Sequence, residues 1–219
     1  MFYNFFIYFS AYIGLFAVIF YSLSLRKRSK LKEPIFNEKD PPFISVIVPA
    51  YNEEKGIAST LQSLLKVDYP KNKMEIIVVN DGSEDKTLSI AKKYQCKLIR
   101  VFTKKNGGKG SALNYGINRA KGKFIFTMDA DSVLDPRSIK PQVARFQNPK
   151  VMCVAPIVAI NKPRGILLRV QQVEFFLGIF LREAFSSLNA IHVTPGAFSA
   201  YRKSFFDKYV GFDENNLTE

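Results

Sequence analysis

The chain has 219 residues, of which 47% are hydrophobic and 23% are charged. This balance excludes a disordered chain, and the length suffices for one sizeable folded domain. The formal net charge of +13 predicts an anionic partner, which could be a nucleotide, a nucleic acid or a lipid headgroup surface. Cys96 and Cys153 stand far apart in apolar surroundings, so we expect two reduced core residues rather than a disulfide or a metal site.

The first 25 residues contain no Asp, Glu, Lys or Arg. At about 1.5 Å per residue, a helix of this length crosses a hydrocarbon core of about 30 Å, so residues 1–25 are predicted to be a transmembrane helix. A cleavable signal peptide would carry basic residues before its apolar core, whereas here they follow it. The positive-inside rule therefore predicts a single-pass protein of the cell membrane, with its N-terminus outside and the rest of the chain in the cytoplasm.

Residues 26–42 are predicted to be a basic, proline-containing linker, after which strands and helices alternate. Apolar runs predict strands at residues 43–49, 74–79, 96–102, 124–128 and 151–156. Helical spacing predicts helices at residues 53–66, 84–95 and 110–120, and a fourth that begins at Asp135 and Pro136; Asn52 and Ser83 are predicted N-caps. This alternation predicts an α/β fold over residues 43–219, a doubly wound, mainly parallel sheet with helices on both faces.

Polar clusters follow the predicted strands at their carboxyl ends, where ligands bind in such sheets. They are residues 49–54, residues 80–83, the glycine-rich basic loop 104–111, and Asp129-Ala-Asp131. Asp129 and Asp131 lie two residues apart, so both carboxylates can face one divalent cation. Each cluster alone is also explained by turn chemistry, but four at one edge favour a binding site.

The glycine-rich loop fits neither of two common nucleotide-binding fingerprints, because Thr103 and Leu113 stand where glycines are required. Small residues beside Lys109 at the start of a helix still offer backbone amides and a cation to a phosphate. We therefore expect a phosphate contact at Lys109 without a P-loop.

A long helix is predicted after the sheet, over residues 165–188, but four charged residues interrupt it too often for a membrane span: Arg169, Glu174, Arg182 and Glu183. It could pack on the domain core, or lie at the level of the lipid headgroups with residues 175–181 as its apolar patch. His192 has no neighbouring His or Cys and is expected to be structural. A turn and short strand are predicted over residues 194–202, and a short helix over residues 204–209.

Taken in order, these motifs resemble the family 2 glycosyltransferases of the GT-A fold, and within them the membrane-bound poly-N-acetylglucosamine, hyaluronan, chitin and cellulose synthases. The resemblance is carried by residues 48–54 (VPAYNEE), 79–83 (VNDGS), 106–114 (NGGKGSALN), 129–131 (DAD), 196–202 (GAFSAYR) and 217–219 (LTE). The stretch at residues 196–202 is most similar to the poly-N-acetylglucosamine synthase branch.

The resemblance implies a role for each motif. Donor binding would involve Pro49, Ala50, Tyr51, Glu53, Asp81, Lys109, Asp129 and Ala130. Among these, Asp81 would accept a hydrogen bond from uracil and Lys109 would approach the diphosphate. Asp131 would bind Mg²⁺ or Mn²⁺, and the floor of the acceptor site would comprise Gly196, Ala197 and Phe198. The implied activity is inverting transfer of N-acetylglucosamine or another hexose from a UDP-sugar to a glycan or lipid-linked acceptor at the cytoplasmic membrane face.

The family's general base is the aspartate of a Thr-Glu-Asp triplet, and this chain carries Thr218 and Glu219. Asp129 and Glu219 are therefore the catalytic candidates, with the expected base one position further on. We expect the domain to be incomplete at this end, and the 219-residue chain to bind donor with little transfer.

Two other functions compete with this reading. A polyprenyl-phosphate sugar transferase would share the donor motifs, but the Thr218-Glu219 pair argues against it. A membrane-tethered nucleic-acid-binding module would explain the charge, yet the basic residues are scattered and no aromatic-basic RNA motif is present, so no nucleic-acid partner is expected.

Overall fold

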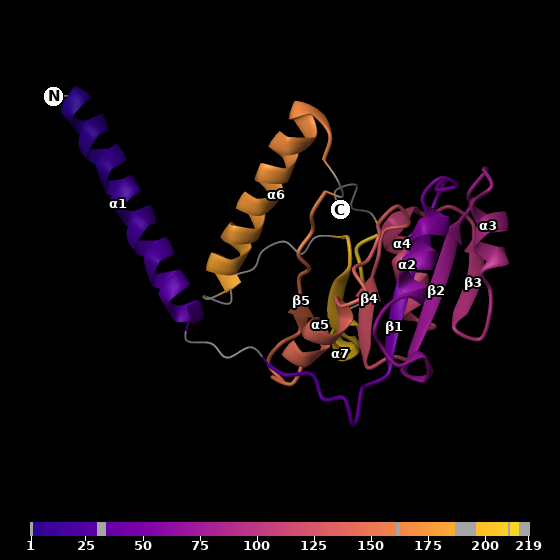
Figure 1. Cartoon of the computed structure of the whole chain (residues 1–219). Helices are drawn as coiled ribbons and strands as arrows, with labels where there is room; N and C mark the ends of the chain where they lie inside the picture. Colours follow the sequence, from indigo (N-terminus) through magenta and orange to yellow (C-terminus); the bar gives the residue numbers. More distant parts are fainter. Residues whose placement is uncertain (1, 30–33, 161–162, 187–195, 210, 215–219) are drawn as a thin grey trace. The chain divides into compact units, whose positions relative to one another are not determined.

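The computed structural model describes residues 2–29, 34–160, 163–186, 196–209 and 211–214. They belong to two compact units, each considered by itself: a helical unit of residues 1–33 and 157–193, and a sheet domain of residues 34–156 and 194–219 (Figure 1).

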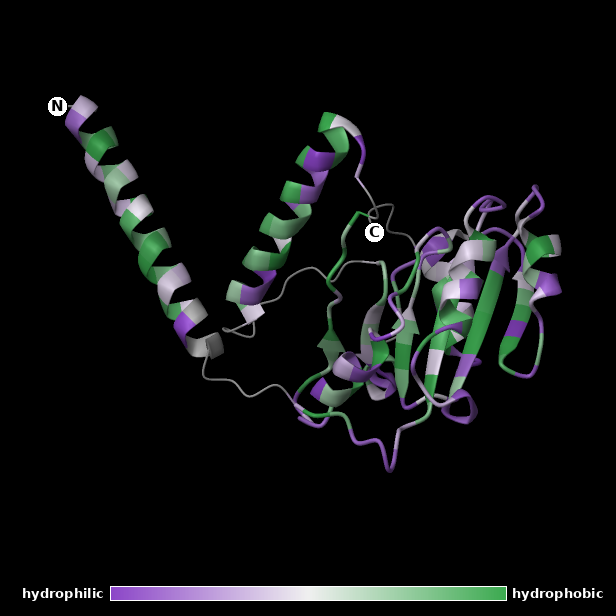
Figure 2. Cartoon of the chain, viewed as in Figure 1, coloured by the Kyte–Doolittle hydropathy of each residue, from purple (hydrophilic) through white to green (hydrophobic). Residues whose placement is uncertain are grey.

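The helical unit contains α1 (Phe2–Ser29) and α6 (Gly165–Ser186). Tyr3–Ser24 in α1 is apolar and long enough to cross a membrane, and Figure 2 shows hydrophobic residues along the helix. The two helices meet through aromatic side chains, with the ring centroids of Tyr21 and Phe180 5.2 Å apart. Ala184 is the buried residue of α6, and the packing of this helix on the domain core stays a prediction. His192 lies outside the described residues.

The described residues of the sheet domain form six strands in the order β3-β2-β1-β4-β6-β5. Their bounds are β1 Ile44–Ala50, β2 Met74–Asp81, β3 Ile99–Lys104, β4 Phe124–Thr127, β5 Cys153–Val154 and β6 Ser199–Arg202. β1, β2, β3 and β4 run parallel, whereas β6 is antiparallel to both β4 and β5. The mainly parallel α/β sheet is confirmed, but the predicted fifth strand is only two residues long and its pairing is antiparallel.

Helices cover both faces of this sheet, and every residue of β1 and β2 is therefore buried. Val46 and Val48 join the core formed with α2 and α5, whereas Ile47 joins the core formed with α4 and α7. The helices are α2 (Ile57–Leu65), α3 (Thr87–Lys93), α4 (Gly108–Ile117), α5 (Ile139–Arg145) and α7 (Lys203–Lys208), with a 3₁₀ turn at Lys71–Lys73.

A buried carboxylate joins three strands near their amino ends. Glu75 of β2 accepts hydrogen bonds from the Ser45 hydroxyl of β1 and from the Lys121 backbone, both at 2.7 Å. Its other oxygen lies 2.6 Å from the guanidinium of Arg100 in β3. The network fixes β1, β2 and β3 against the segment that enters β4.

Three predicted helix starts are wrong, because the polar residues are used elsewhere. α2 begins after Gly56, α3 after Lys86 and α5 after Ser138. Asn52 instead accepts a hydrogen bond from the backbone of Glu84, and Ser83 accepts one from the backbone of Asn52. Asp135 accepts the backbone N–H of Arg137 within the turn before α5.

Neither cysteine forms a disulfide in the part of the chain that the structure describes. Cys96 is exposed rather than part of the core, because β3 begins three residues later than predicted, at Ile99. Cys153 is partly buried in β5.

Candidate active site

The carboxyl edge of the sheet gathers the polar motifs, as expected for a parallel sheet. Residues 51–54 follow β1, Asp81 ends β2, Lys104 ends β3 and Asp129 follows β4. Pro49 and Ala50 are buried at the end of β1, whereas Tyr51 is 47% exposed. The edge therefore presents side chains from four neighbouring strands.

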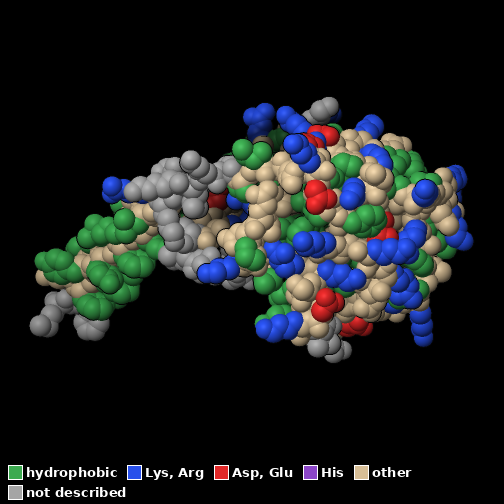
Figure 3. All heavy atoms as spheres, turned by 90° about the horizontal axis from the view of Figure 1, so that it is seen from below, with side chains coloured by type: hydrophobic (Ala, Val, Ile, Leu, Met, Phe, Trp, Pro, Cys, Tyr) green, Lys and Arg blue, Asp and Glu red, His purple; other side chains and the backbone are tan. Residues whose placement is uncertain are grey.

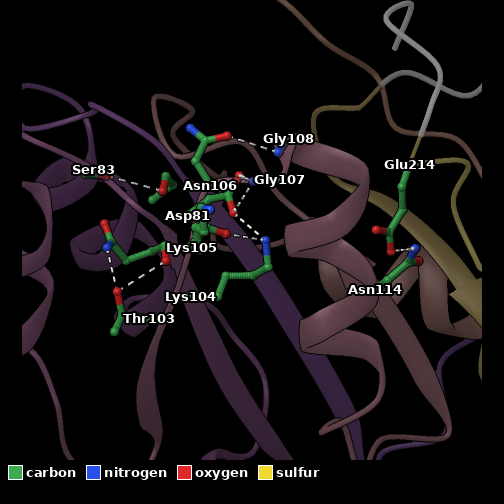
Figure 4. A network of polar contacts seen from close by, with 12 residues as sticks. Asp81, Ser83, Thr103, Lys104, Lys105, Asn106, Gly107, Gly108, Asn114 and Glu214 are labelled. Atoms are coloured by element: carbon green, nitrogen blue, oxygen red, sulfur yellow. Dashed lines mark hydrogen bonds and ion pairs between the residues drawn. The ribbon is translucent and has the colours of Figure 1, made fainter.

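Asp81 is almost fully buried, with 2% exposure, beneath the loop that follows β3. Its Oδ1 accepts a hydrogen bond from Lys104 Nζ at 2.7 Å, and the backbone N–H of Gly107 lies 3.2 Å from both carboxylate oxygens (Figure 4). Gly82, with φ of +72°, turns the chain here, and a Cβ at this position would lie 2.8 Å from the backbone nitrogen of Asn106. The arrangement holds an acceptor and a cationic donor side by side.

Lys104 received no individual role from the sequence, although it stands in the predicted basic loop. The sequence offered no signal for it, because the predicted strand ended at residue 102, whereas β3 runs to Lys104, opposite Asp81 in the parallel register with β2.

Lys109, Asp129 and Gly196 come together from three distant motifs. Lys109 Nζ lies 3.0 Å from Asp129 Oδ1, and the two side chains are 25% and 29% exposed. A Cβ on Gly196 would lie 3.1 Å from that Nζ and 3.6 Å from both Asp129 oxygens, so Gly196 lies directly against the ion pair. The glycine loop, the aspartate motif and the segment before β6 thus form one site.

The predicted acceptor floor continues from Gly196 into the sheet. Ala197 is partly buried, and Phe198 is 4% exposed, with its ring centroid 5.1 Å from that of Phe126 in β4. Phe198 has φ of +69°, and the buried ring contact holds it in this left-handed conformation. Packing therefore fixes the position of this segment beside Asp129.

Carboxylates are concentrated beside the ion pair. Burial raises the pKa of Glu53, and the charges of Asp131, Asp85 and Asp129 raise it further. Asp131 is exposed and accepts a hydrogen bond from Ser132 Oγ at 3.3 Å. Carboxylates this close together create a local negative potential that attracts a cation.

These carboxylates suit a hard divalent cation. Among the described residues no group of three or more His, Cys, Asp and Glu forms a complete metal cluster. Magnesium-type sites, however, need only one or two protein carboxylates, since water and substrate phosphates supply the other oxygens. Exposed Asp131, with Asp129 two residues away, fits that kind of open site.

Two residues missed in the sequence hold the aspartate motif in place. Thr60 of α2 is fully buried, and its Oγ1 lies 2.7 Å from the carbonyl oxygen of Ala130 and 2.8 Å from that of Ser132. A Cβ on Gly56 would lie 2.8 Å from the Cα of Asp131, so this position requires a glycine. Thr60 was detectable only as a polar residue in an apolar helical stripe. Ala130 itself is buried, and Glu219 lies outside the described residues.

Comparisons with known sequences agree with this geometry. Residues 45–210 match the model of glycosyl transferase family 2. A poly-beta-1,6-N-acetyl-D-glucosamine synthase of Staphylococcus epidermidis is 32% identical over 183 residues, which cover 80% of this chain and 43% of the relative. The probable glycosyltransferase YdaM of Bacillus subtilis is 33% identical over 192 residues, covering 84% of this chain and 46% of the relative. The chain thus spans about half the length of the curated relatives it matches.

Solved structures share the fold. The mannosyltransferase PcManGT from Pyrobaculum calidifontis, in complex with GDP-Man and Mn²⁺, has a TM-score of 0.72 at 24% identity, covering 90% of this chain and 55% of its own. The S. aureus protein TarS 1-349, in complex with UDP, has a TM-score of 0.62 at 27% identity, covering 80% and 52%. The predicted GT-A fold is confirmed.

Proposed function

The chain belongs to glycosyltransferase family 2, and on that basis we propose that it transfers N-acetylglucosamine from UDP-N-acetylglucosamine to a glycan acceptor, with inversion at the anomeric carbon. The observation that carries the proposal is the ion pair of Lys109 and Asp129 against Gly196, on the same sheet edge at which Asp81 ends β2. The choice of sugar is supported by 32% identity to a poly-N-acetylglucosamine synthase.

Uracil recognition is assigned to Asp81 and Lys104. The uracil ring has an N–H donor between two carbonyl acceptors, so it needs an acceptor beside a donor. The Asp81 carboxylate supplies the acceptor, and Lys104 Nζ, 2.7 Å from it, supplies the donor. Cytosine and adenine lack a ring N–H at the matching position, so this pair disfavours them.

Diphosphate binding is assigned to the start of α4 and Lys109. The first residues of a helix expose backbone N–H groups and a partial positive charge that favour a phosphate. Gly108 leaves the space above this end open, since a Cβ there would meet no atom within 4 Å. Lys109 then adds a full positive charge, which is also paired with Asp129.

Asp131 is proposed to hold a divalent cation, with Asp129 near the sugar. When bound, the cation supplies Lewis-acid stabilisation of the negative charge on the leaving diphosphate. The chain's own contribution is to keep Asp131 exposed and the neighbouring turn fixed through Thr60. Mn²⁺ and Mg²⁺ both suit carboxylate oxygens.

The acceptor is proposed to lie over Gly196, Ala197 and Phe198, beside Asp129. Its hydroxyl must lose a proton to a base within about 2.6–3.2 Å. We assign that base to the motif that begins with Thr218 and Glu219, whose counterpart in the family is a Thr-Glu-Asp triplet with the aspartate as the base.

The proposed location is the cytoplasmic face of a membrane, anchored through α1. The apolar Tyr3–Ser24 stretch and the basic residues from Arg26 onward support this orientation. On the face of the sheet domain seen in Figure 3, Lys and Arg side chains spread over much of the surface, with a few Asp and Glu side chains among them. Such a surface favours an anionic ligand.

The test replaces Asp131 by Asn in the full-length protein. The exposed position tolerates the amide, so we expect an unchanged melting temperature but loss of Mn²⁺-dependent UDP binding by calorimetry and of transfer from UDP-N-acetylglucosamine. Asp207→Asn, at an exposed carboxylate of α7, is the matched control. Unchanged Mn²⁺-dependent affinity in Asp131→Asn would refute the metal role, and no UDP binding by the unaltered protein would refute the proposed function.

A further inference from the structure

Two loops at the carboxyl edge of the sheet are joined by hydrogen bonds in both directions. Residues 52–54 follow β1, whereas residues 83–87 follow β2 and lead into α3. Three consecutive backbone N–H groups of the first loop donate to side chains of the second: Asn52 to Ser83 Oγ at 3.1 Å, Glu53 to Thr87 Oγ1 at 2.7 Å and Glu54 to Asp85 Oδ2 at 3.0 Å. We call this contact between residues 52–54 and 83–87 the loop lock.

The second loop donates back to the first. The backbone N–H of Glu84 donates to Asn52 Oδ1 at 2.9 Å, and that of Lys86 donates to Glu54 Oε2 at 3.2 Å. Asn52 has φ of +52°, a left-handed conformation that asparagine adopts more readily than most residues. Thr87 is fully buried, so its hydroxyl bonds to Glu53 away from solvent. Each loop thus fixes the backbone of the other.

The loop lock lies beside the two residues that we connect with the base: Asp81, assigned above to uracil, and Tyr51, which the family resemblance places in the donor site. Ala50 pairs with Asn80 in the parallel register of β1 and β2, so Tyr51 and Asp81 follow at the same level of two neighbouring strands. Tyr51 immediately precedes the lock, and Asp81 stands two residues before it. Both residues are therefore held by the sheet on one side and by the lock on the other.

The loop lock also occupies the backbone donors of the loop after β1. In doubly wound sheets, nucleotide phosphates commonly bind backbone N–H groups where the first strand turns into its helix. Here the N–H groups of residues 52–54 are already bonded to side chains of residues 83–87. This loop is therefore suited to the base rather than to the phosphates, in agreement with the assignment of the diphosphate to the start of α4.

We propose that Asn52 and Thr87 are positioning residues for the nucleoside, holding Tyr51 and Asp81 in the arrangement that binds uracil before the donor arrives. The inference rests on the proposed function. A site that is already formed binds its ligand without the loss of entropy that ordering two loops would bring. The lock should therefore raise the affinity for the nucleoside part of the donor and leave the phosphate and cation contacts unchanged.

The test replaces Thr87 by Val in the full-length protein. Valine keeps the branched shape and removes the hydroxyl that accepts the Glu53 N–H. Calorimetric titration with uridine, which has no phosphate, should show a Kd raised about 3- to 10-fold, as expected when one lost hydrogen bond lowers the population of the binding-competent conformation. The Kd for UDP with Mn²⁺ should rise by the same factor. Thr87→Ser restores the hydroxyl and should bring both Kd values back to within about twofold of the unaltered protein.

Ser89→Ala is the matched control. Ser89 is exposed two residues beyond Thr87 in α3, and its hydroxyl donates to the carbonyl oxygen of Lys86 at the start of the same helix. Its removal leaves the loop lock intact, so both Kd values should stay unchanged.

Asn52→Gly keeps the test decisive should Thr87→Val fold poorly. Glycine adopts the left-handed φ of this position, so the variant removes the acceptor of the Glu84 N–H without straining the backbone. Both Kd values should rise about 2- to 5-fold, since this bond is more exposed. In transfer assays either variant should raise KM for UDP-N-acetylglucosamine and leave kcat within about twofold, as for the loss of binding that is equal in the ground state and the transition state.

Unchanged uridine affinity in both Thr87→Val and Asn52→Gly would overturn the positioning role while leaving the proposed function intact. A lower binding stoichiometry at unchanged Kd would also overturn it, since the lock would then serve only folding. A loss for UDP without a loss for uridine would overturn it as well, because the effect would then lie at the phosphates or the cation. An unaltered protein that binds neither uridine nor UDP would overturn the proposed function, and this inference with it.

Discussion

Replacing Lys109 by Ala separates diphosphate recognition from base recognition. A hydrogen bond to a charged group contributes about 1.5–3 kcal/mol. In the unliganded protein Lys109 already pairs with Asp129 at 3.0 Å, and because both side chains are a quarter or more exposed that pair is worth at most about 1 kcal/mol. The net loss in UDP binding should therefore be about 0.5–3 kcal/mol, a factor of about 2–150 in Kd.

Uridine provides the internal comparison, because it reaches Asp81 and Lys104 but has no phosphate. Calorimetric titrations of UDP and of uridine into the Mn²⁺-loaded protein should show the loss for UDP alone. Lys105→Ala is the matched control, since Lys105 is exposed in the same loop and the change in net charge is identical. Equal losses for UDP and uridine, or an equal effect of Lys105→Ala, would refute the diphosphate contact.

Two predictions concern stability. Glu75→Ala should lower the free energy of unfolding by about 2–3 kcal/mol in urea titrations, because the Ser45 hydroxyl, the Lys121 backbone N–H and Arg100 lose their acceptor. The control Glu84→Ala, at an exposed position, should change it by less than about 0.5 kcal/mol. Glu214 has a lowered pKa because Asn114 donates to it, so its stabilising effect is complete above pH 4.5 and is lost as the pH falls through the lowered pKa. The difference in melting temperature between the unaltered protein and Glu214→Gln should vanish over that fall; a constant difference would contradict this role.

The sheet and its ligand-binding edge were predictable because both follow from local pattern. A nearly continuous apolar run such as residues 44–50 is buried on two faces, as in a parallel sheet with helices on each side. Once the strands are parallel, the residues that follow them share one edge. Asp81 and Asp129 were therefore located together without knowledge of any contact.

The helix starts were not predictable, because Asn52 and Ser83 fit the local pattern of an N-cap but make hydrogen bonds to a distant loop instead. Each precedes a helical stretch, as an N-cap does, yet each bonds across the edge to the loop of the other strand. Helix propensity is worth only tenths of a kcal/mol per residue, so two loop-to-loop hydrogen bonds suffice to shift the first turn. Polar residues at the functional edge are the ones for which local capping rules fail.

The contact of Asn114 with Phe212 shows why spacing alone could not assemble the acceptor side. Asn114 and Phe212 lie 98 residues apart in the chain. In addition, β6, which precedes Phe212, is antiparallel to β4, whereas β1 to β4 run parallel. What the sequence did contain was Gly110 four residues before Asn114, a small residue and an amide on one face of a helix. A glycine and an amide on one face of a helix allow another backbone to approach closely and to form hydrogen bonds there. The helix that begins at the proposed phosphate site thus also binds the backbone of Phe212 and the side chain of Glu214.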